Sequence, residues 1–277
     1  MSQYSRGVRA KKNLGQHFLV DEKALHNIAA QVTPPETTPF YLEIGPGTGN
    51  LTEHILLNTG DSPVIALERD DRVIPVLRSR FSGSTLEVIE ADALSFDLSS
   101  LPDGRGVAIG NLPYNVATGI FVRCLSAHSH FSTLVFMYQQ EVAKRITAQP
   151  GTSAYGSLSV FAQLWGRHEL LMTLPPEAFS PPPKVESGVV VSHVSSSPLF
   201  EVGSNPQAFE KFVKGAFQHR RKTIGKSLAL AGWERKLIDR GLEACEFPKM
   251  VRAEALSPPE LGQLWNKIQE PDLDVTR

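Results

Sequence analysis

The chain has 277 residues and a mass of 30.4 kDa, which is long enough for one large domain and a smaller one. With 41% hydrophobic and 21% charged residues, its composition is that of a globular protein, and no apolar run approaches the roughly 18 residues of a membrane helix. The basic N-terminus lacks the apolar core of a signal peptide, and Cys124 and Cys245 stand alone. These features exclude a disulfide framework and predict a cytoplasmic protein without a membrane partner.

The net charge of −1 hides an uneven distribution of charge along the chain. Residues 1–20 carry four basic residues and no acidic ones, namely Arg6, Arg9, Lys11 and Lys12. Residues 40–110 hold eleven acidic and five basic residues, whereas residues 207–250 hold ten basic and five acidic. Basic segments beside an acidic domain indicate a polyanionic partner such as a nucleic acid, although a solvated charged surface gives the same pattern.

Short apolar runs alternate with helical stretches through the first two thirds of the chain. Asp21 is placed to cap a first helix. Apolar runs then follow at residues 40–44, 64–67, 86–89, 107–109 and 134–137, with helical stretches at 51–57, 71–80, 117–126 and 140–148. This alternation predicts an α/β fold with a mostly parallel sheet and helices on both faces. Two later runs, at 169–174 and 189–194, lack a helical crossover and suggest an antiparallel edge pair.

The pattern becomes helical after the polar segment at residues 195–198. Phe209, Phe212 and Phe217 keep a helical period, and residues 257–260 resemble a capping box ahead of a last amphipathic helix. We therefore predict an α/β domain over residues 1–195 and a small all-helical domain over residues 196–277.

A glycine-rich turn follows the first predicted strand. Gly45, Gly47 and Gly49 come directly after Glu43 and open a helix, which allows a sharp turn and close approach to a nucleotide-like ligand. The spacing is GxGxG, whereas dinucleotide-binding folds prefer GxGxxG. An acidic residue before the turn suits S-adenosylmethionine, because the methionine part of that cofactor is zwitterionic. Turn chemistry without a ligand is the alternative reading.

Two acidic residues end the next two apolar runs. Glu68 is placed to accept hydrogen bonds from both ribose hydroxyls of a nucleoside cofactor, or else to begin an exposed charged loop. Asp92 is placed to accept a hydrogen bond from the adenine amino group, or else to form a turn.

The tetrapeptide Asn111-Leu112-Pro113-Tyr114 follows the fourth apolar run and is the most specific motif. The exocyclic amine of a nucleobase is a poor nucleophile because its lone pair is delocalised into the ring. An Asn amide oxygen and the carbonyl of Leu112, held rigid by Pro113, can each accept one N–H bond from that amine. They thereby turn its lone pair toward a methyl donor, while Tyr114 offers a flat face for an extruded base. The alternative is a turn with a buried tyrosine.

With these motifs in order along the chain, the sequence resembles the rRNA adenine N6-dimethyltransferases, in particular those acting on small-subunit rRNA. The resemblance runs nearly end to end, and the matching blocks lie at residues 12–19, 43–49, 111–114, 139–145, 155–159, 179–185 and 217–223. It implies a Rossmann-like class I S-adenosylmethionine-dependent methyltransferase domain.

The resemblance also implies roles for individual residues. The segment around His17 and Leu19 is expected to cover the cofactor, and Gly45, Gly47, Glu68, Asp92 and Asn111 match the other cofactor positions. His17 stands where many relatives have Asn. Phe179 resembles an aromatic residue that sandwiches the target adenine opposite Tyr114, although it also reads as a core residue that anchors a proline-rich loop.

A basic cluster follows Phe217 and consists of Arg220, Arg221, Lys222 and Lys226. Together with the family resemblance, it predicts contacts to RNA phosphates, against the alternative of a solvated helix face. His128 and His130 have no acidic or cysteine neighbour in sequence, so we predict no metal site.

The sequence as a whole predicts S-adenosylmethionine-dependent N6-dimethylation of two adjacent adenosines in a hairpin loop near the 3′ end of small-subunit (16S) rRNA. The expected partner is that rRNA or a pre-30S-type subunit, with a role in small-subunit biogenesis, and the protein is expected to be a monomer. Two alternatives remain open, namely dimethylation of large-subunit rRNA and a non-catalytic RNA-binding role in ribosome assembly.

Overall fold

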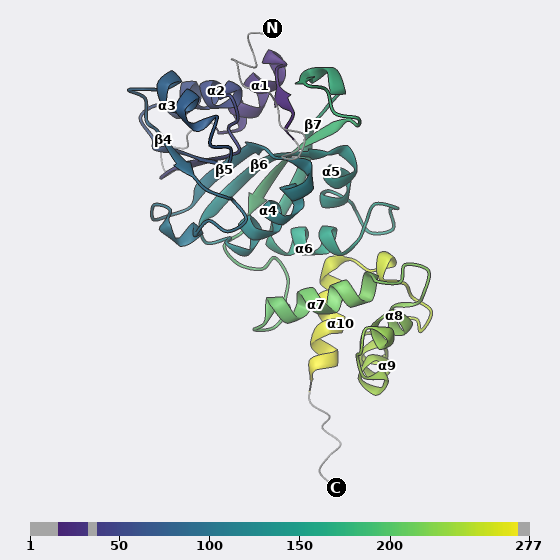
Figure 1. The fold of residues 1–277 in the computed structure, drawn as a ribbon. Coiled ribbons are helices and arrows are strands. Elements are labelled where there is room, and N and C mark those ends of the chain that lie inside the picture. Colours follow the sequence, from purple (N-terminus) through teal and green to yellow (C-terminus); the bar gives the residue numbers. More distant parts are fainter. Residues whose placement is uncertain (1–15, 33–37, 271–277) are drawn as a thin grey trace. The chain divides into compact units, whose positions relative to one another are not determined.

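The computed structural model describes residues 16–32 and 38–270, and the basic residues at positions 6–12 lie outside the described part (Figure 1). The chain divides into two compact units. The first comprises the described residues up to Thr147 together with Arg167–Ser196, and the second comprises Ala148–Gly166 and the described residues from Ser197 onward. No helix in the described ranges is long and apolar enough to cross a membrane.

A seven-stranded sheet in the order β4-β3-β2-β5-β6-β9-β7 forms the centre of the first unit. Its strands are β2 (Tyr41–Ile44), β3 (Val64–Glu68), β4 (Leu86–Glu90), β5 (Gly106–Asn111), β6 (Phe131–Gln139), β7 (Gly166–Leu174) and β9 (Ser187–Val194). β2, β3, β4, β5 and β6 run parallel to one another, and β9 is antiparallel to β6. The five predicted apolar runs are therefore confirmed as strands, and the two later runs are neighbours at one edge of the sheet.

The order of the strands reverses next to β2. The chain moves outward from β2 through β3 to β4 and then returns to β5 on the other side of β2. In open parallel sheets, such a reversal leaves a crevice beyond the carboxyl ends of the two flanking strands, and ligands bind there. The strand order therefore places a candidate site beyond Ile44 of β2 and Asn111 of β5.

Within the described residues, five helices accompany the strands of this sheet. They are α1 (Glu22–Ala29), α2 (Asn50–Thr59), α3 (Ile74–Arg80), α4 (Tyr114–Ser126) and α5 (Gln140–Ile146). The carboxylate of Asp21 accepts a hydrogen bond from the backbone N–H of Ala24 at 2.9 Å, which confirms it as the N-cap of α1. Leu25 and Ile28 on the buried face of α1 belong to the same core cluster as Tyr41 of β2.

The second unit is helical. It consists of α6 (Ser157–Trp165), α7 (Pro206–Phe217), α8 (Ile224–Leu230), α9 (Arg235–Ala244) and α10 (Pro258–Gln269). The capping box before α10 is confirmed, because the backbone N–H of Ser257 donates to the carboxylate of Glu260 at 2.7 Å. Phe209 and Phe212 of α7 pack against Trp265 of α10.

The division of the chain differs from the predicted boundary at 195/196, because residues 148–166 lie in the second unit. The hydroxyl of buried Tyr155 donates to the backbone carbonyl of Leu256 at 3.0 Å, and the backbone N–H of Gly151 donates to that of Glu254 at 2.8 Å. Helix α6 is not among the elements predicted from the sequence. Nearly every side chain of α6 is apolar or buried, so the helix lacks the polar face that reveals an amphipathic helix.

Candidate active site

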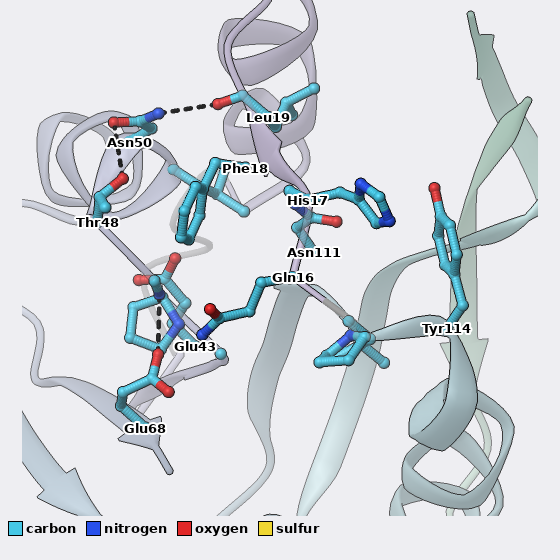
Figure 2. Close-up of a pocket in the computed structure, with 16 residues that line it drawn as sticks. Gln16, His17, Phe18, Leu19, Glu43, Thr48, Asn50, Glu68, Asn111 and Tyr114 are labelled. Carbon is cyan, nitrogen blue, oxygen red and sulfur yellow. Dashed lines mark hydrogen bonds between the residues drawn. The ribbon is translucent and has the colours of Figure 1, made fainter. Parts of the chain in front are cut away.

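Side chains from the ends of three parallel strands meet around one cavity in the first unit (Figure 2). Glu43 comes from β2, Glu68 from β3 and Asn111 from β5. The cavity is lined by Gln16, His17, Phe18, Leu19, Glu43, Gly45, Pro46, Gly47, Thr48, Asn50, Leu51, Glu68, Asn111, Leu112, Pro113 and Tyr114. It lies where the reversal of the strand order predicts a crevice.

The glycine-rich turn between β2 and α2 forms one wall of the cavity. Gly45, Gly47 and Gly49 all have positive φ angles, of 70°, 55° and 83°, which side chains rarely adopt. A Cβ atom on Gly47 would lie 2.9 Å from the ring of Phe18, so the turn also needs glycine for space. The chain can therefore turn tightly here and bring backbone of Gly45 and Gly47 to the cavity.

Glu68 holds this turn in place from the end of β3. Its Oε2 accepts the backbone N–H of Gly47 at 3.0 Å, and its Oε1 accepts those of Arg69 and Asp70 at 2.8 Å. The residue is 6% exposed, and burial raises the pKa of its carboxyl, while these backbone N–H groups oppose the rise. Glu68 is thus a fixed acceptor whose Oε2 reaches the cavity wall.

Glu43 is a second buried carboxyl group at the cavity. It is 1% exposed, and burial raises its pKa to about 8, with the charge of Glu68 adding to the increase. Its Oε2 has no hydrogen-bond partner among the described residues. A cationic ligand beside this carboxyl would favour its charged form and so oppose the rise in its pKa. The acid before the glycine-rich turn is visible in the sequence, but its burial at the cavity cannot be read from the motif, so Glu43 is an addition to the predicted site residues.

The segment Gln16–Leu19 covers the cavity. Strand β1 (Phe18–Leu19) pairs antiparallel with β8 (Phe179–Ser180), and Asn50 Nδ2 donates to the carbonyl of Leu19 at 2.9 Å. Gln16 Nε2 donates to Asp70 Oδ2 at 3.0 Å. This segment is thus tied to β8, to α2 and to the loop after β3.

The covering segment also orients Asn111. Asn111 Nδ2 donates to the backbone carbonyl of His17 at 2.8 Å (Figure 2). With the amide nitrogen engaged in this way, Oδ1 is left as the end of the amide that is able to accept a bond from a substrate amine. The backbone of His17, rather than its side chain, fixes which end of Asn111 is offered.

Tyr114 stands at the first turn of α4 and faces the ring of His17 across the mouth of the cavity (Figure 2). The two ring centroids are 5.8 Å apart with an interplanar angle of 24°. The phenol oxygen of Tyr114 lies 2.6 Å from Ser187 Oγ on β9. Burial raises the pKa of the phenol. The motif thus presents an amide oxygen and an aromatic face on the same side of the cavity.

Asp92 and Phe179 do not line the cavity. Asp92 follows β4, pairs with Arg69 Nη1 at 3.1 Å, and accepts the backbone N–H of Leu94, so the turn that its alternative reading predicted is present. Phe179 is 3% exposed and packs in the core cluster with Leu19 and Ala178. Its role opposite Tyr114 stays a prediction.

The basic cluster lies in the second unit, between α7 and α8 and on α8. Arg221, Lys222 and Lys226 are exposed. Arg220 donates to the carbonyl of Ser153 at 2.9 Å and lies 3.6 Å from the carboxylate of Glu254. Part of the charge of Arg220 is therefore engaged within the protein, while the other three side chains project into solvent.

Comparison with known proteins identifies relatives along nearly the whole chain. A sequence profile of the family described as Ribosomal RNA adenine dimethylase matches residues 7–243. The chain is 40% identical to "Ribosomal RNA small subunit methyltransferase A" of Acidobacterium capsulatum over 94% of this chain and 92% of that protein. It is 41% identical to the protein of the same name from Gluconobacter oxydans, over 94% and 84% of the two chains.

Solved structures share the fold. The 23S rRNA methyltransferase ErmE is 26% identical with a TM-score of 0.70, covering 91% of this chain and all of that one. A dimethyladenosine transferase from Plasmodium falciparum is 24% identical with a TM-score of 0.76, covering 91% and 98% of the two chains. The predicted Rossmann-like class I methyltransferase fold is confirmed.

The burial of Glu43 makes stability depend on pH. Because its folded pKa of about 8 exceeds the ordinary value of 4.5, the folded state holds a proton that the unfolded state has lost between these values. Stability should therefore fall as pH rises from about 4.5 to 8. Glu43→Gln should remove this part of the decline and be about 2–4 kcal/mol more stable than wild type at pH 8.5, since one pKa unit corresponds to about 1.4 kcal/mol.

Urea unfolding of the cofactor-free protein at several pH values measures this difference. Glu87→Gln, which changes an exposed carboxyl on β4, is the matched control and should follow the wild type. An equal decline with pH in wild type and Glu43→Gln would contradict the assignment.

Proposed function

Because this chain belongs to the ribosomal RNA adenine dimethylase family, we propose that it dimethylates N6 of adenosines in small-subunit rRNA. It is an rRNA adenine dimethyltransferase, and S-adenosylmethionine is its methyl donor. The choice of the small subunit is supported by relatives 34–41% identical to this chain that carry that subunit in their names. Two adjacent adenosines in a hairpin loop near the 3′ end are the proposed target, with a role in small-subunit biogenesis.

The residues at the cavity fit the cofactor. Oε2 of Glu43, which has no partner among the described residues, suits the ammonium group of its methionine part, whose charge would favour loss of the Glu43 proton. Gly45 brings backbone without a side chain to the cavity. Glu68 offers acceptors for the ribose. We assign Asp92 to the adenine amino group, which requires its side chain to turn away from Arg69. We assign the backbone at His17 and Leu19 to the segment that covers the bound cofactor. The cofactor supplies an electrophilic methyl group on a sulfonium sulfur.

The tetrapeptide Asn111-Leu112-Pro113-Tyr114 (the NLPY motif) positions the adenine amine for methyl transfer. Oδ1 of Asn111 and the carbonyl of Leu112 each accept one N–H of the adenine amine, which directs its lone pair toward the methyl group. Tyr114 stacks on the base, and Phe179 is retained as its proposed opposite wall. Alignment of reacting atoms in this way supplies a large effective molarity. No strong base is required, because the amine loses its proton after the methyl group has been transferred.

Large-subunit rRNA is the second candidate substrate. The likeness to a 23S rRNA methyltransferase over 91% of the chain favours it, but at a lower identity than the small-subunit relatives. The set of Glu43, Glu68, Asn111 and Tyr114 around one cavity argues against an assembly factor without catalytic activity. We further propose that the protein acts as a monomer in the cytoplasm, on rRNA or on a pre-30S-type particle.

Asn111→Ala tests the proposed chemistry. It removes the acceptor that aims the amine, so the rate of methyl transfer should fall by at least ~100-fold while RNA affinity stays within about twofold. Labelled S-adenosylmethionine, unmethylated small subunits and mass spectrometry of the nucleosides measure the rate and identify the product. Asn58→Ala, which changes an asparagine on α2 outside the cavity lining, is the control. A near-normal rate in Asn111→Ala would refute the role of the amide.

We assign RNA phosphate binding to Arg220, Arg221, Lys222 and Lys226 of the basic cluster. Arg221, Lys222 and Lys226 are the main candidates, because their side chains are exposed and make no hydrogen bond or ion pair to another described residue. Arg220 contributes from a position already held by Ser153 and Glu254.

Replacing Arg221 and Lys222 together by Ala should weaken rRNA binding and reduce its dependence on salt. Each lost phosphate contact lowers the slope of log affinity against log salt by about 0.7–0.9. The matched control replaces Arg235 and Lys249 by Ala, which removes the same two residue types from the same unit. Filter binding across a salt series gives the slope for each variant. A slope equal to that of the wild type after loss of Arg221 and Lys222 would show that the cluster is a solvated surface and does not bind phosphates.

A further inference from the structure

A buried serine outside the cavity lining contacts the motif residue that is proposed to stack on the base. Ser187 is the first residue of β9, and it is fully buried at 0% exposure. A buried hydroxyl needs a partner, and the partner of this one is the phenol oxygen of Tyr114 at 2.6 Å. One of the two hydroxyls donates to the other, so neither is left without a partner.

The contact fixes the far end of the Tyr114 ring. The near end is set by the backbone, because Pro113 precedes it with φ −58° and Tyr114 begins α4. A tyrosine side chain has only two rotatable bonds before its ring, so a bond at the hydroxyl fixes the direction of the ring axis, and the ring of His17, stacked at 5.8 Å, lies beside its face.

The position of Ser187 is itself held by its neighbours. It pairs with Gln139 in the register of β6 and β9, and Gln140 N–H donates to the carbonyl of Glu186 at 2.9 Å. At the next position, a Cβ on Gly188 would lie 2.6 Å from Cβ of Ala143, so α5 packs directly on the start of this strand. Ser187 Oγ is thus a fixed point of the sheet rather than part of a loop.

We propose that Ser187 is a positioning residue for methyl transfer, which anchors the Tyr114 ring at the place where the target base stacks and thereby keeps the adenine amine in line with the methyl group. The inference rests on the proposed function, since it concerns the base that Tyr114 stacks on. Ser187 does not line the cofactor cavity, so it acts on the transfer step and leaves cofactor affinity unchanged.

The test is a double-mutant cycle of Ser187→Ala and Tyr114→Phe, each of which removes the same hydrogen bond from one side. Single-turnover methyl transfer to unmethylated small subunits should slow about 10-fold in each single variant, because small misplacements of reacting groups cost rate steeply. The double variant should be no slower than the slower single one. The dissociation constant of S-adenosylmethionine should stay within about twofold, and Ser187→Thr, which keeps the hydroxyl, should recover the rate.

Ser192→Ala is the matched control, since Ser192 is a buried serine on the same strand, 1% exposed, bonded through Oγ to His168 Nδ1 at 2.8 Å. It should transfer methyl groups at the wild-type rate. A normal rate in Ser187→Ala, or multiplied losses in the double variant, would overturn the inference while the proposed function stands. If Ser187→Ala does not fold, Tyr114→Phe alone decides, because its normal rate also overturns the inference. Absence of transfer by the wild-type protein would instead overturn the proposed function.

Discussion

The position of β2 between β3 and β5 is the constraint on which the rest of the site depends. Because the chain leaves β2 in one direction and returns on the other side, backbone and side chains at the carboxyl ends of these strands surround a crevice instead of packing against a crossover. Glu43, Glu68 and Asn111 reach the cavity from three rigid strands. Groups held on such strands keep their geometry better than groups on loops.

Two buried carboxyl groups at one cavity are unfavourable for the protein alone. Burial raises the pKa of both Glu43 and Glu68, and the negative charge of Glu68 disfavours a second charge on Glu43. Glu68 offsets this cost with three backbone N–H bonds, whereas Glu43 keeps an unpaired oxygen. A cationic cofactor supplies the missing partner, so the site gives up some stability of the unliganded protein in return for binding energy.

Much of this architecture was predictable from local pattern. The five parallel strands, the Asp21 cap and the residues of the NLPY motif follow from apolar runs, capping chemistry and motif spacing. The assignment of α6 to the second unit could not be predicted, because nothing in the apolar and buried residues of this helix shows which core they enter. The bond from Asn111 to the carbonyl of His17 links residues 94 positions apart, and no local signal in either segment reports it. The burial of Phe179 likewise depends on the pairing of β1 with β8.

The most direct test of the account is the identity of the methylated product and of the subunit that carries it. Purified protein would be incubated with labelled S-adenosylmethionine and with unmethylated small subunits, large subunits or DNA, and the nucleosides identified by mass spectrometry. The account predicts N6,N6-dimethyladenosine in small-subunit rRNA alone. Label in large-subunit rRNA would contradict the proposed substrate, and no label in any sample, despite measurable binding of cofactor and RNA, would contradict the proposed catalysis.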